Sequence, residues 1–165
     1  MPNNAIIGTL GGIYDPAQIV VTLTVKGAMP NSPTPSVHGG TLSGFGENII
    51  TLERVSEQAD SYSGADGQVV QFYTNDRRGR YQIELEPTSL SLAIMTSIAN
   101  ADETAGAVHF SLSVKDNNGN DVLTASDSWV RKRPRVVYRK GIEVRVFECE
   151  CANLVMNLVG QGTMQ

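Results

Sequence analysis

The residues best suited to chemistry in this chain are its two cysteines, Cys149 and Cys151, which flank Glu150. Thiolates two residues apart on a strand point to the same side, so the pair could begin a zinc site. A structural zinc needs four ligands, however, and the two histidines, His38 and His109, lie at no motif spacing from the pair. We therefore interpret the thiols as small apolar groups of a core, and strand geometry argues against a disulfide between them.

A hydrolase would need a nucleophile beside a general base. Ser89 and Ser91 are conceivable nucleophiles for His109, but neither serine lies in a GxSxG elbow or a comparable setting. His109 stands between Val108 and Phe110 in an alternating stretch, which predicts a strand histidine that faces solvent or a neighbour. The sequence therefore predicts no enzymatic activity, no catalytic residue, no cofactor and no metal.

The acidic residues suggest a collective role instead. In the stretch Arg80–Glu86, Gln82, Glu84 and Glu86 alternate with apolar residues, which predicts one buried and one wet face of a strand. Glu53 could add a further carboxylate, although acidic side chains on a wet face are ordinarily just solvated. Repeated by symmetry in an assembly, such a face would form a negative wall.

A basic cluster admits two interpretations. It consists of Arg131, Lys132, Arg133 and Arg135 around Pro134, with Arg139-Lys140 after it. It could bind nucleic acid, or it could meet an acidic face on another subunit. We favour a subunit contact because Lys and Arg number 13 against 17 Asp and Glu, which gives a net charge of −4, and dedicated nucleic-acid binders rely on an excess of basic residues.

The length of 165 residues suits a single domain over 1–165. Residues 27–40, which are rich in Pro and Gly, predict a loop; a linker between two domains is the competing interpretation, but the piece before it is too small to fold alone. No run approaches the ~18 apolar residues of a membrane span, and the start MPNNAIIGTL lacks the features of a secretory signal. We therefore expect synthesis in a cytoplasm, where free cysteines are usual.

Periodicity predicts a mainly β fold with one helix. The helix is SLSLAIMTSIAN, capped by Thr88 or Ser89, with Leu90, Ile94 and Ile98 at spacings of four. A polar stretch at 56–67 predicts a long protruding loop. The phase of alternation changes within Gly141–Leu158, through bulges or because both faces are partly buried. The expected strands are Ala17–Lys26, Glu47–Val55, Gln68–Thr74, Arg80–Glu86, Ala107–Lys115, Asp121–Ser126 and Gly141–Leu158.

The stretch from Leu42 to Leu92 resembles the tail tube proteins of contractile-tailed bacteriophages. The similarity lies in the order of short motifs: Gly44-Phe45 before a strand, a Gly64-Ala65-Asp66-Gly67 turn, Asn75-Asp76 with Gly79, and Thr88-Ser89 at a helix start. The later Lys132–Pro134 and the stretch at Tyr138 resemble that family's C-terminal half less specifically. The chain departs from the pattern at Leu90 and Ser91, where many relatives carry Asn, and in the loop at 27–40.

The resemblance implies a β-sandwich or half-barrel with one flanking helix, six copies of which form a ring. Rings would stack helically into a hollow conduit for genome delivery, with DNA passing through without specific binding. The implied partners are the protein itself, a sheath protein, a tape-measure protein, and baseplate and tail terminator proteins, in a virion made in a bacterial cytoplasm. The long loop would contact the next ring, through Ser56, Glu57, Asp60, Tyr62 and Asp66, while Gln82, Glu84 and Glu86 would face the lumen.

Two alternatives remain at this stage. The same kind of subunit builds the tubes of headless bacteriocins and type VI secretion devices. A soluble β-sandwich that binds carbohydrate or a cell-surface ligand is the other alternative, although such a module should expose aromatic residues around a concave site, and aromatic residues make up only 6% of this chain.

Overall fold

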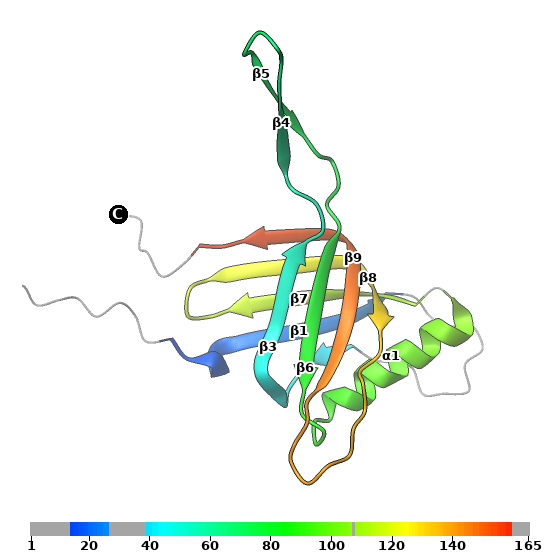
Figure 1. The fold of residues 1–165 in the computed structure, drawn as a ribbon. Coiled ribbons are helices and arrows are strands. Elements are labelled where there is room, and N and C mark those ends of the chain that lie inside the picture. The colour runs from blue at the N-terminus through cyan, green and yellow to red at the C-terminus, as the bar shows by residue number, and fades with distance from the viewer. Residues whose placement is uncertain (1–13, 27–38, 107, 160–165) are drawn as a thin grey trace, which may run out of the picture.

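The computed structural model describes residues 14–26, 39–106 and 108–159. The fold is mainly β, with a curled, seven-stranded antiparallel sheet that forms a half-barrel and one flanking helix (Figure 1). The strand order in the sheet is β2-β1-β7-β8-β9-β6-β3, and strands β4 and β5 pair separately. The elements are the 3-10 turn η1 (Pro16–Gln18), β1 (Ile19–Lys26), β2 (Gly40–Thr41), β3 (Phe45–Arg54), β4 (Ala59–Ser63), β5 (Val69–Tyr73), β6 (Gly79–Leu85), α1 (Ser91–Ala105), β7 (His109–Asp116), β8 (Asp121–Lys132) and β9 (Arg145–Asn157).

Strand β9 joins the two layers of the half-barrel. Its first half pairs with β6 from Arg145 to Cys151, and the longer stretch from Glu148 to Asn157 pairs with β8. Figure 1 shows β3, β6 and the orange half of β9 in one layer, while β8, β7 and β1 cross behind them and the red half of β9 joins that second layer. One continuous strand therefore forms the corner of the fold.

The bend of β9 coincides with a change in the spacing of its buried residues. Cys149 and Cys151 are buried two apart, but the next buried side chain in β9 is Leu154, three residues on. Strand β8 shows the same step between Ala125 and Ser128, and Asp127 between them has a φ of 52°. One change of phase is therefore present, at the corner where β9 changes layer. The strand itself begins at Arg145 and not at the predicted Gly141.

The core lies between the layers and under the helix. Along β6 the side chains of Tyr81, Ile83 and Leu85 are buried while Gln82 is exposed, as the alternation predicted. Met95 and Ile98 of α1 join the same cluster. At about 25 cal/mol per Å² of buried apolar surface, this cluster is the main source of stability. Its other members come chiefly from β1, β7 and β9: Val21, Leu23, Phe110, Leu112, Val114, Phe147, Cys149, Cys151 and Leu154.

The helix begins later than predicted. Its N-cap is Leu90, whose side chain makes no capping hydrogen bond and is 85% exposed. The Ser89 hydroxyl nevertheless accepts a hydrogen bond from the Ser91 backbone N–H at 3.2 Å, so serine caps the helix from one position earlier. The predicted cap Ser89 thus supplies the capping hydrogen bond, whereas the alternative cap Thr88 and the predicted apolar role of Leu90 are wrong. At the other end Gly106 takes a φ of 67°, which suits glycine at a helix terminus.

The strands expected at 47–55, 68–74 and 80–86 do not pair in chain order. Strand β3 pairs directly with β6, whereas β5 pairs with β4 in a hairpin that rises clear of the sheet (Figure 1). The segment predicted as a protruding loop, 56–67, does protrude, but β4 occupies part of it. Its sequence has no apolar alternation, so only the backbone pairing with β5 makes it a strand.

The second hairpin follows the prediction more closely. Strands β7 and β8 pair around a turn at 117–120 in which Asn120 has a φ of 58°, although β8 continues to Lys132, well past the expected end. Residue 107 and most of the predicted loop at 27–40 lie outside the described residues. No helix among the described residues is long and apolar enough to cross a membrane.

Candidate assembly surfaces

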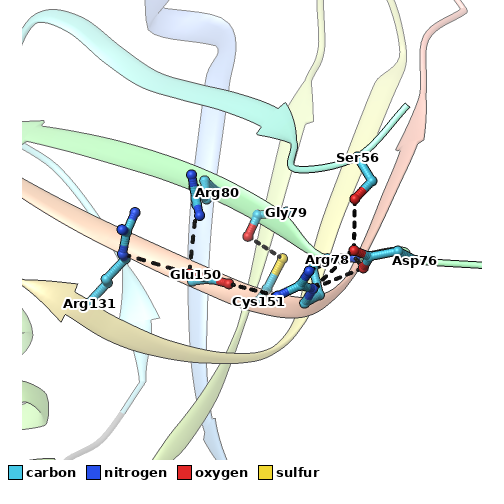
Figure 2. Close-up of polar contacts among 8 residues, drawn as sticks. All are labelled: Ser56, Asp76, Arg78, Gly79, Arg80, Arg131, Glu150 and Cys151. Carbon is cyan, nitrogen blue, oxygen red and sulfur yellow. Dashed lines mark hydrogen bonds and ion pairs between the residues drawn. The ribbon is translucent and has the colours of Figure 1, made fainter. Parts of the chain in front are cut away.

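A dense polar cluster fixes the base of the β4–β5 hairpin (Figure 2). Asp76 accepts hydrogen bonds from the Arg78 Nη2 at 2.8 Å and from the Arg78 backbone N–H at 3.0 Å. The Ser56 hydroxyl, on the chain entering the hairpin, donates to the same carboxylate at 2.8 Å. The hydrogen bonds from Arg78 hold the pKa of Asp76 well below its usual range, and the carboxylate raises the pKa of Arg78. The cluster thus ties the entering and leaving chains together.

Glu150 extends this cluster across the sheet. Its carboxylate, whose side chain is only 12% exposed, lies 3.9 Å from Arg78 Nη1, 3.7 Å from Arg80 Nε and 3.8 Å from Arg131 Nε. Figure 2 shows it between these three basic residues. Each contact is long and therefore weak alone, but together they link β6, β8 and β9 to the hairpin base.

The cysteines behave as core groups. Both are free and buried, and the Cys151 Sγ donates to the Gly79 carbonyl oxygen at 3.6 Å (Figure 2). Burial raises the pKa of the Cys149 thiol far above its usual range, which keeps it protonated. Among the described residues no group of three or more His, Cys, Asp and Glu could hold a metal ion. The interpretation of the thiols as apolar core groups is confirmed.

The residues considered above for hydrolysis are Ser89, Ser91 and His109, and each has a structural contact in the fold. The Ser91 hydroxyl accepts a hydrogen bond from the Ser43 N–H at 2.7 Å, and the Ser89 hydroxyl donates to the Ser43 carbonyl oxygen. The two serines thereby attach the start of α1 to the segment before β3. His109 is exposed at the start of β7, with its ring centroid 6.1 Å from that of Trp129, as expected for a strand histidine facing outward.

The hairpin itself carries an unusual set of exposed apolar side chains. Its five large apolar residues are between 49% and 68% exposed: Tyr62, Val69, Val70, Phe72 and Tyr73. Of these, only Tyr62 was among the predicted contact residues, because the sequence of β5 indicates a strand of the main sheet. Exposed apolar side chains gathered on one element are typical of a surface that meets a partner.

The other predicted contact residues of the hairpin lie along its length. Ser56 is part of the base cluster, and Glu57 is exposed just above it. Asp60 lies on β4, where it accepts a hydrogen bond from the Ser61 N–H at 2.7 Å. Asp66 lies at the tip and accepts a hydrogen bond from the Gln68 N–H at 3.1 Å.

The wet face of β6 gains carboxylates from β9. The register places Glu148 opposite Gln82 and Glu150 opposite Arg80, and directly paired residues of antiparallel strands share a face. Glu84 accepts hydrogen bonds from the Asn48 side chain at 2.9 Å and its backbone N–H at 3.3 Å. Glu86 lies just beyond the strand and is exposed. Sequence reasoning missed Glu148 and Glu150 because the pairing of β6 with β9 is not local.

Three members of the predicted basic patch have acidic partners in their own chain. Arg131 faces Glu150, the Lys132 Nζ lies 3.2 Å from Glu148, and the Arg133 Nη2 lies 2.8 Å from Glu103 of α1. Arg135 is exposed in the segment after β8 and makes no ion pair with a described residue. The cation of this patch most available to another chain is therefore Arg135.

The sheet has two incompletely paired edges. Among the described residues, β3 pairs only with β6, and the outer side of β1 is covered only by the two-residue strand β2. Open edges expose rows of backbone N–H and C=O groups that can pair with another chain. One subunit therefore carries an open edge on each layer.

A profile of the family described as bacteriophage PhiTE tail tube protein matches residues 20–158. The chain belongs to this family. The match spans the sheet from β1 to β9 together with the hairpin and the helix, so the resemblance to tail tube proteins is confirmed. As a member of the family, the chain is a structural subunit of a phage tail tube and a component of the virion.

Three solved structures are similar to this chain. A tube-terminating cap of the anti-feeding prophage is 13% identical, with a TM-score of 0.45 over 93% of this chain and 99% of that one. The sheath-tube complex of an extracellular contractile injection system is 12% identical, with a TM-score of 0.47 over 93% and 95%. A sheath/tube terminator of the same system is 12% identical, with a TM-score of 0.45 over 90% and 99%. A search of curated proteins found no match.

Proposed function

We propose that six copies of this subunit join their sheets edge to edge into a ring, and that rings stack into a hollow tube through which the phage genome enters the host cell. The observation that carries this proposal is the pair of open edges, β3 on one layer and β1 with β2 on the other. An edge that pairs with the next copy removes the exposed backbone groups of both. A heterologous contact of this kind closes a ring when the rotation per copy divides the circle.

Stacking uses the β4–β5 hairpin in this proposal. The hairpin stands away from the sheet (Figure 1), its base is fixed by Asp76 and Arg78, and its apolar side chains are exposed. These properties suit an element that reaches the adjacent ring. The proposed contact residues are Ser56, Glu57, Asp60, Tyr62 and Asp66, joined by the apolar residues of β5.

The wet face of β6 is proposed to line the lumen. Gln82, Glu84 and Glu86 would then repeat around the ring, and Glu148 of β9 lies on the same face. Carboxylates repel DNA phosphates, so the genome would slide without binding. Arg131 and Lys132 of the basic patch reach this face as well, where they pair with Glu150 and Glu148. Arg135, which has no such partner among the described residues, is proposed to contact a neighbouring subunit.

The remaining partners follow from this architecture. A sheath protein would surround the tube, a tape-measure protein would occupy it during assembly, and baseplate and terminator proteins would bind its ends. Synthesis would take place in the host cytoplasm before incorporation into the virion. We treat residues 1–165 as one tail-tube-like domain in this proposal.

Negative-stain electron microscopy of the purified full chain tests the proposal. We expect hollow rods or six-fold rings at high protein concentration. A species that remains strictly monomeric at high concentration, and also in the presence of baseplate nuclei, would contradict the proposed assembly.

A further inference from the structure

An apolar groove lies at the end of the subunit away from the hairpin. It has a volume of about 340 Å³ and runs between α1 and the segment that connects β8 to β9. Leu92, Thr96 and Ala99 form the helix side, Pro134, Val136 and Tyr138 form the opposite side, and Arg145 and Phe147 contribute from β9.

The groove contains a buried guanidinium with incomplete pairing. Arg145 is only 6% exposed, and its buried Nη1 makes no hydrogen bond to a described residue. The Arg145 guanidinium lies over the ring of Tyr138, with 5.6 Å between the Arg145 Cζ and the ring centroid. Tyr138 is itself 91% exposed, so it can swing aside without loss of core packing. A buried cation without a full set of partners is costly, and a carboxylate is the group that satisfies it best.

The charge of the groove is entirely positive. The only ionisable side chains among its lining residues that are charged at neutral pH are Arg133 and Arg145. Arg133 already bonds Glu103 and Asn100 of α1, which leaves Arg145 as the cation without a carboxylate. The groove therefore fits an acidic segment that also carries apolar side chains.

The hairpin has that chemistry. Residues 56–73 contain three acidic residues and no Lys or Arg. Asp66 lies at the exposed tip, next to the exposed Val69 and Val70. The hairpin leaves the sheet at the Gly79 end of β6, whereas Leu85 at the other end pairs with Arg145. Six residue steps of strand separate the two ends by about 20 Å, so the hairpin and the groove point to opposite ends of the subunit.

We propose that the groove receives the hairpin tip of the next copy, with Asp66 paired to Arg145 and the apolar side chains of β5 against Leu92 and Val136. The contact joins different surfaces of two identical chains, and it therefore propagates in one direction along a stack. This inference rests on the proposed tube and specifies which surfaces meet when rings stack.

Cross-linking in assembled rods tests the contact directly. In the full chain we would replace the exposed tip residue Ala65 and Tyr138 by cysteine (A65C with Y138C), which keeps Asp66, and treat the rods with a short bismaleimide. Because tip and groove lie at opposite ends of one subunit, a link between them must join two copies. We expect a ladder of multimers on a denaturing gel. The wild-type chain, whose two cysteines are buried, should give none.

Two matched pairs locate the contact. A65C with I142C places the second thiol in the same connecting segment but outside the groove, at an exposed residue. D60C with Y138C moves the first thiol down the hairpin. Both pairs should cross-link at least about tenfold less than the tip-to-groove pair. If rods form and the control pairs link as well as the tip-to-groove pair, the groove assignment is overturned while the tube remains; if the wild-type chain forms no rods or rings, the proposed function itself fails.

A charge variant provides an independent measurement. Asp66→Asn keeps the acceptor oxygen that the Gln68 N–H uses and removes only the charge offered to Arg145. We expect the protein concentration needed for rod formation to rise about tenfold, because a charge-assisted hydrogen bond contributes on this scale. Asp60→Asn removes the same charge from the same hairpin, but Asp60 lies on β4 below the tip, so this variant should raise that concentration far less. Equal effects of the two variants would overturn the pairing of Asp66 with Arg145.

Discussion

Asp76 shows how one carboxylate can organise a projecting element. It receives hydrogen bonds from both the side chain and the backbone of Arg78, and from Ser56 on the other chain of the hairpin. These donors favour the ionised form, which is why its pKa is lowered. Asp76 thus acts together with the backbone hydrogen bond from the Val55 N–H to the Arg78 carbonyl oxygen, at 3.1 Å, to hold the base of the hairpin.

The lowered pKa predicts a specific loss of stability in acid. The contribution of Asp76 is complete above its ordinary pKa of 3.8 and is lost as the pH falls through the lower pKa of the folded state. In the wild-type chain, the backbone amides at the hairpin base should therefore become less protected from hydrogen exchange as the pH falls. Asp76→Asn should lack that protection already at neutral pH and lose less in acid. Hydrogen exchange at the Arg78 amide, measured between about pH 6 and about pH 2.5, would show this difference in pH dependence between the two proteins.

Asp60→Asn is the control for this measurement. Asp60 accepts a hydrogen bond from the neighbouring Ser61 N–H and lies outside the base cluster, so its variant should follow the wild-type pH profile. An unchanged pH profile for Asp76→Asn would show that the base cluster does not hold the hairpin.

For single residues, the sequence predicts whether a side chain is buried or exposed better than it predicts which residues that side chain contacts. The buried thiols and the outward His109 follow from alternation and spacing. Arg145 does not, because a charged residue at a buried position contradicts the apolar pattern that identifies a core. Glu150 is a similar case, since the three arginines near it come from distant parts of the chain and only the fold brings them together.

At the scale of elements, the hairpin is separable from the sheet. No residue of β4 or β5 belongs to the hydrophobic core cluster of the described residues. The Thr74 N–H donates to the Gln58 carbonyl oxygen at 3.0 Å, so the two ends of the hairpin are already adjacent. The chain can therefore be shortened between Gln58 and Thr74 without moving the strands of the sheet.

Replacement of residues 59–73 by an Asn-Gly turn should give a folded subunit that does not stack. An Asn-Gly pair suits a two-residue connection between antiparallel chains, and the core remains whole. Circular dichroism and denaturant unfolding would check the fold, and electron microscopy would check for rods. Normal tubes from this variant would eliminate the hairpin as the contact between rings.

The same element shows where sequence reasoning stops. VVQFY in β5 correctly indicates a strand, but its apolar side chains suggested a place in the main sheet, whereas they are exposed on a hairpin. Alternation reports which side chains avoid water and gives no information on whether the protein's own core or another chain covers them. The strand β6 was predicted well because a single core covers its apolar face.

At the scale of the whole molecule, the proposed lumen makes a prediction about charge. Gln82→Lys with Glu86→Lys changes two exposed side chains and leaves the hydrogen bonds of Glu84 with Asn48 intact. In a tube lined by this face, each ring would gain a band of positive charge. Variant rods should retain short duplex DNA, with a retention that falls steeply as salt is raised, whereas wild-type rods should not.

A lysine outside the proposed lumen serves as the comparison. Thr104→Lys near the end of α1 adds charge at an exposed position that neither the proposed lumen nor the proposed contacts between copies include. DNA protected from nuclease only in the Gln82 and Glu86 variant would support the lumen assignment. Equal accessibility of the DNA to nuclease in both variants would place this face on the exterior.

The corner strand β9 also has a consequence for how the subunit folds. Until it is in place, β6 and β8 each lack a neighbour on one side, and the two layers are held together only by connecting segments and the helix. Residue 79 pairs with residue 151 and residue 122 with residue 157, so these contacts form only when distant parts of the chain meet, which slows folding. The two layers are then joined in one late step of folding, when β9 pairs with β6 and β8. Before β9 is made, the layer with β3 and the layer with β1 are not joined by a shared strand. The two edges proposed to meet neighbouring copies would then not be held in fixed positions, and ring formation would wait for a completed subunit.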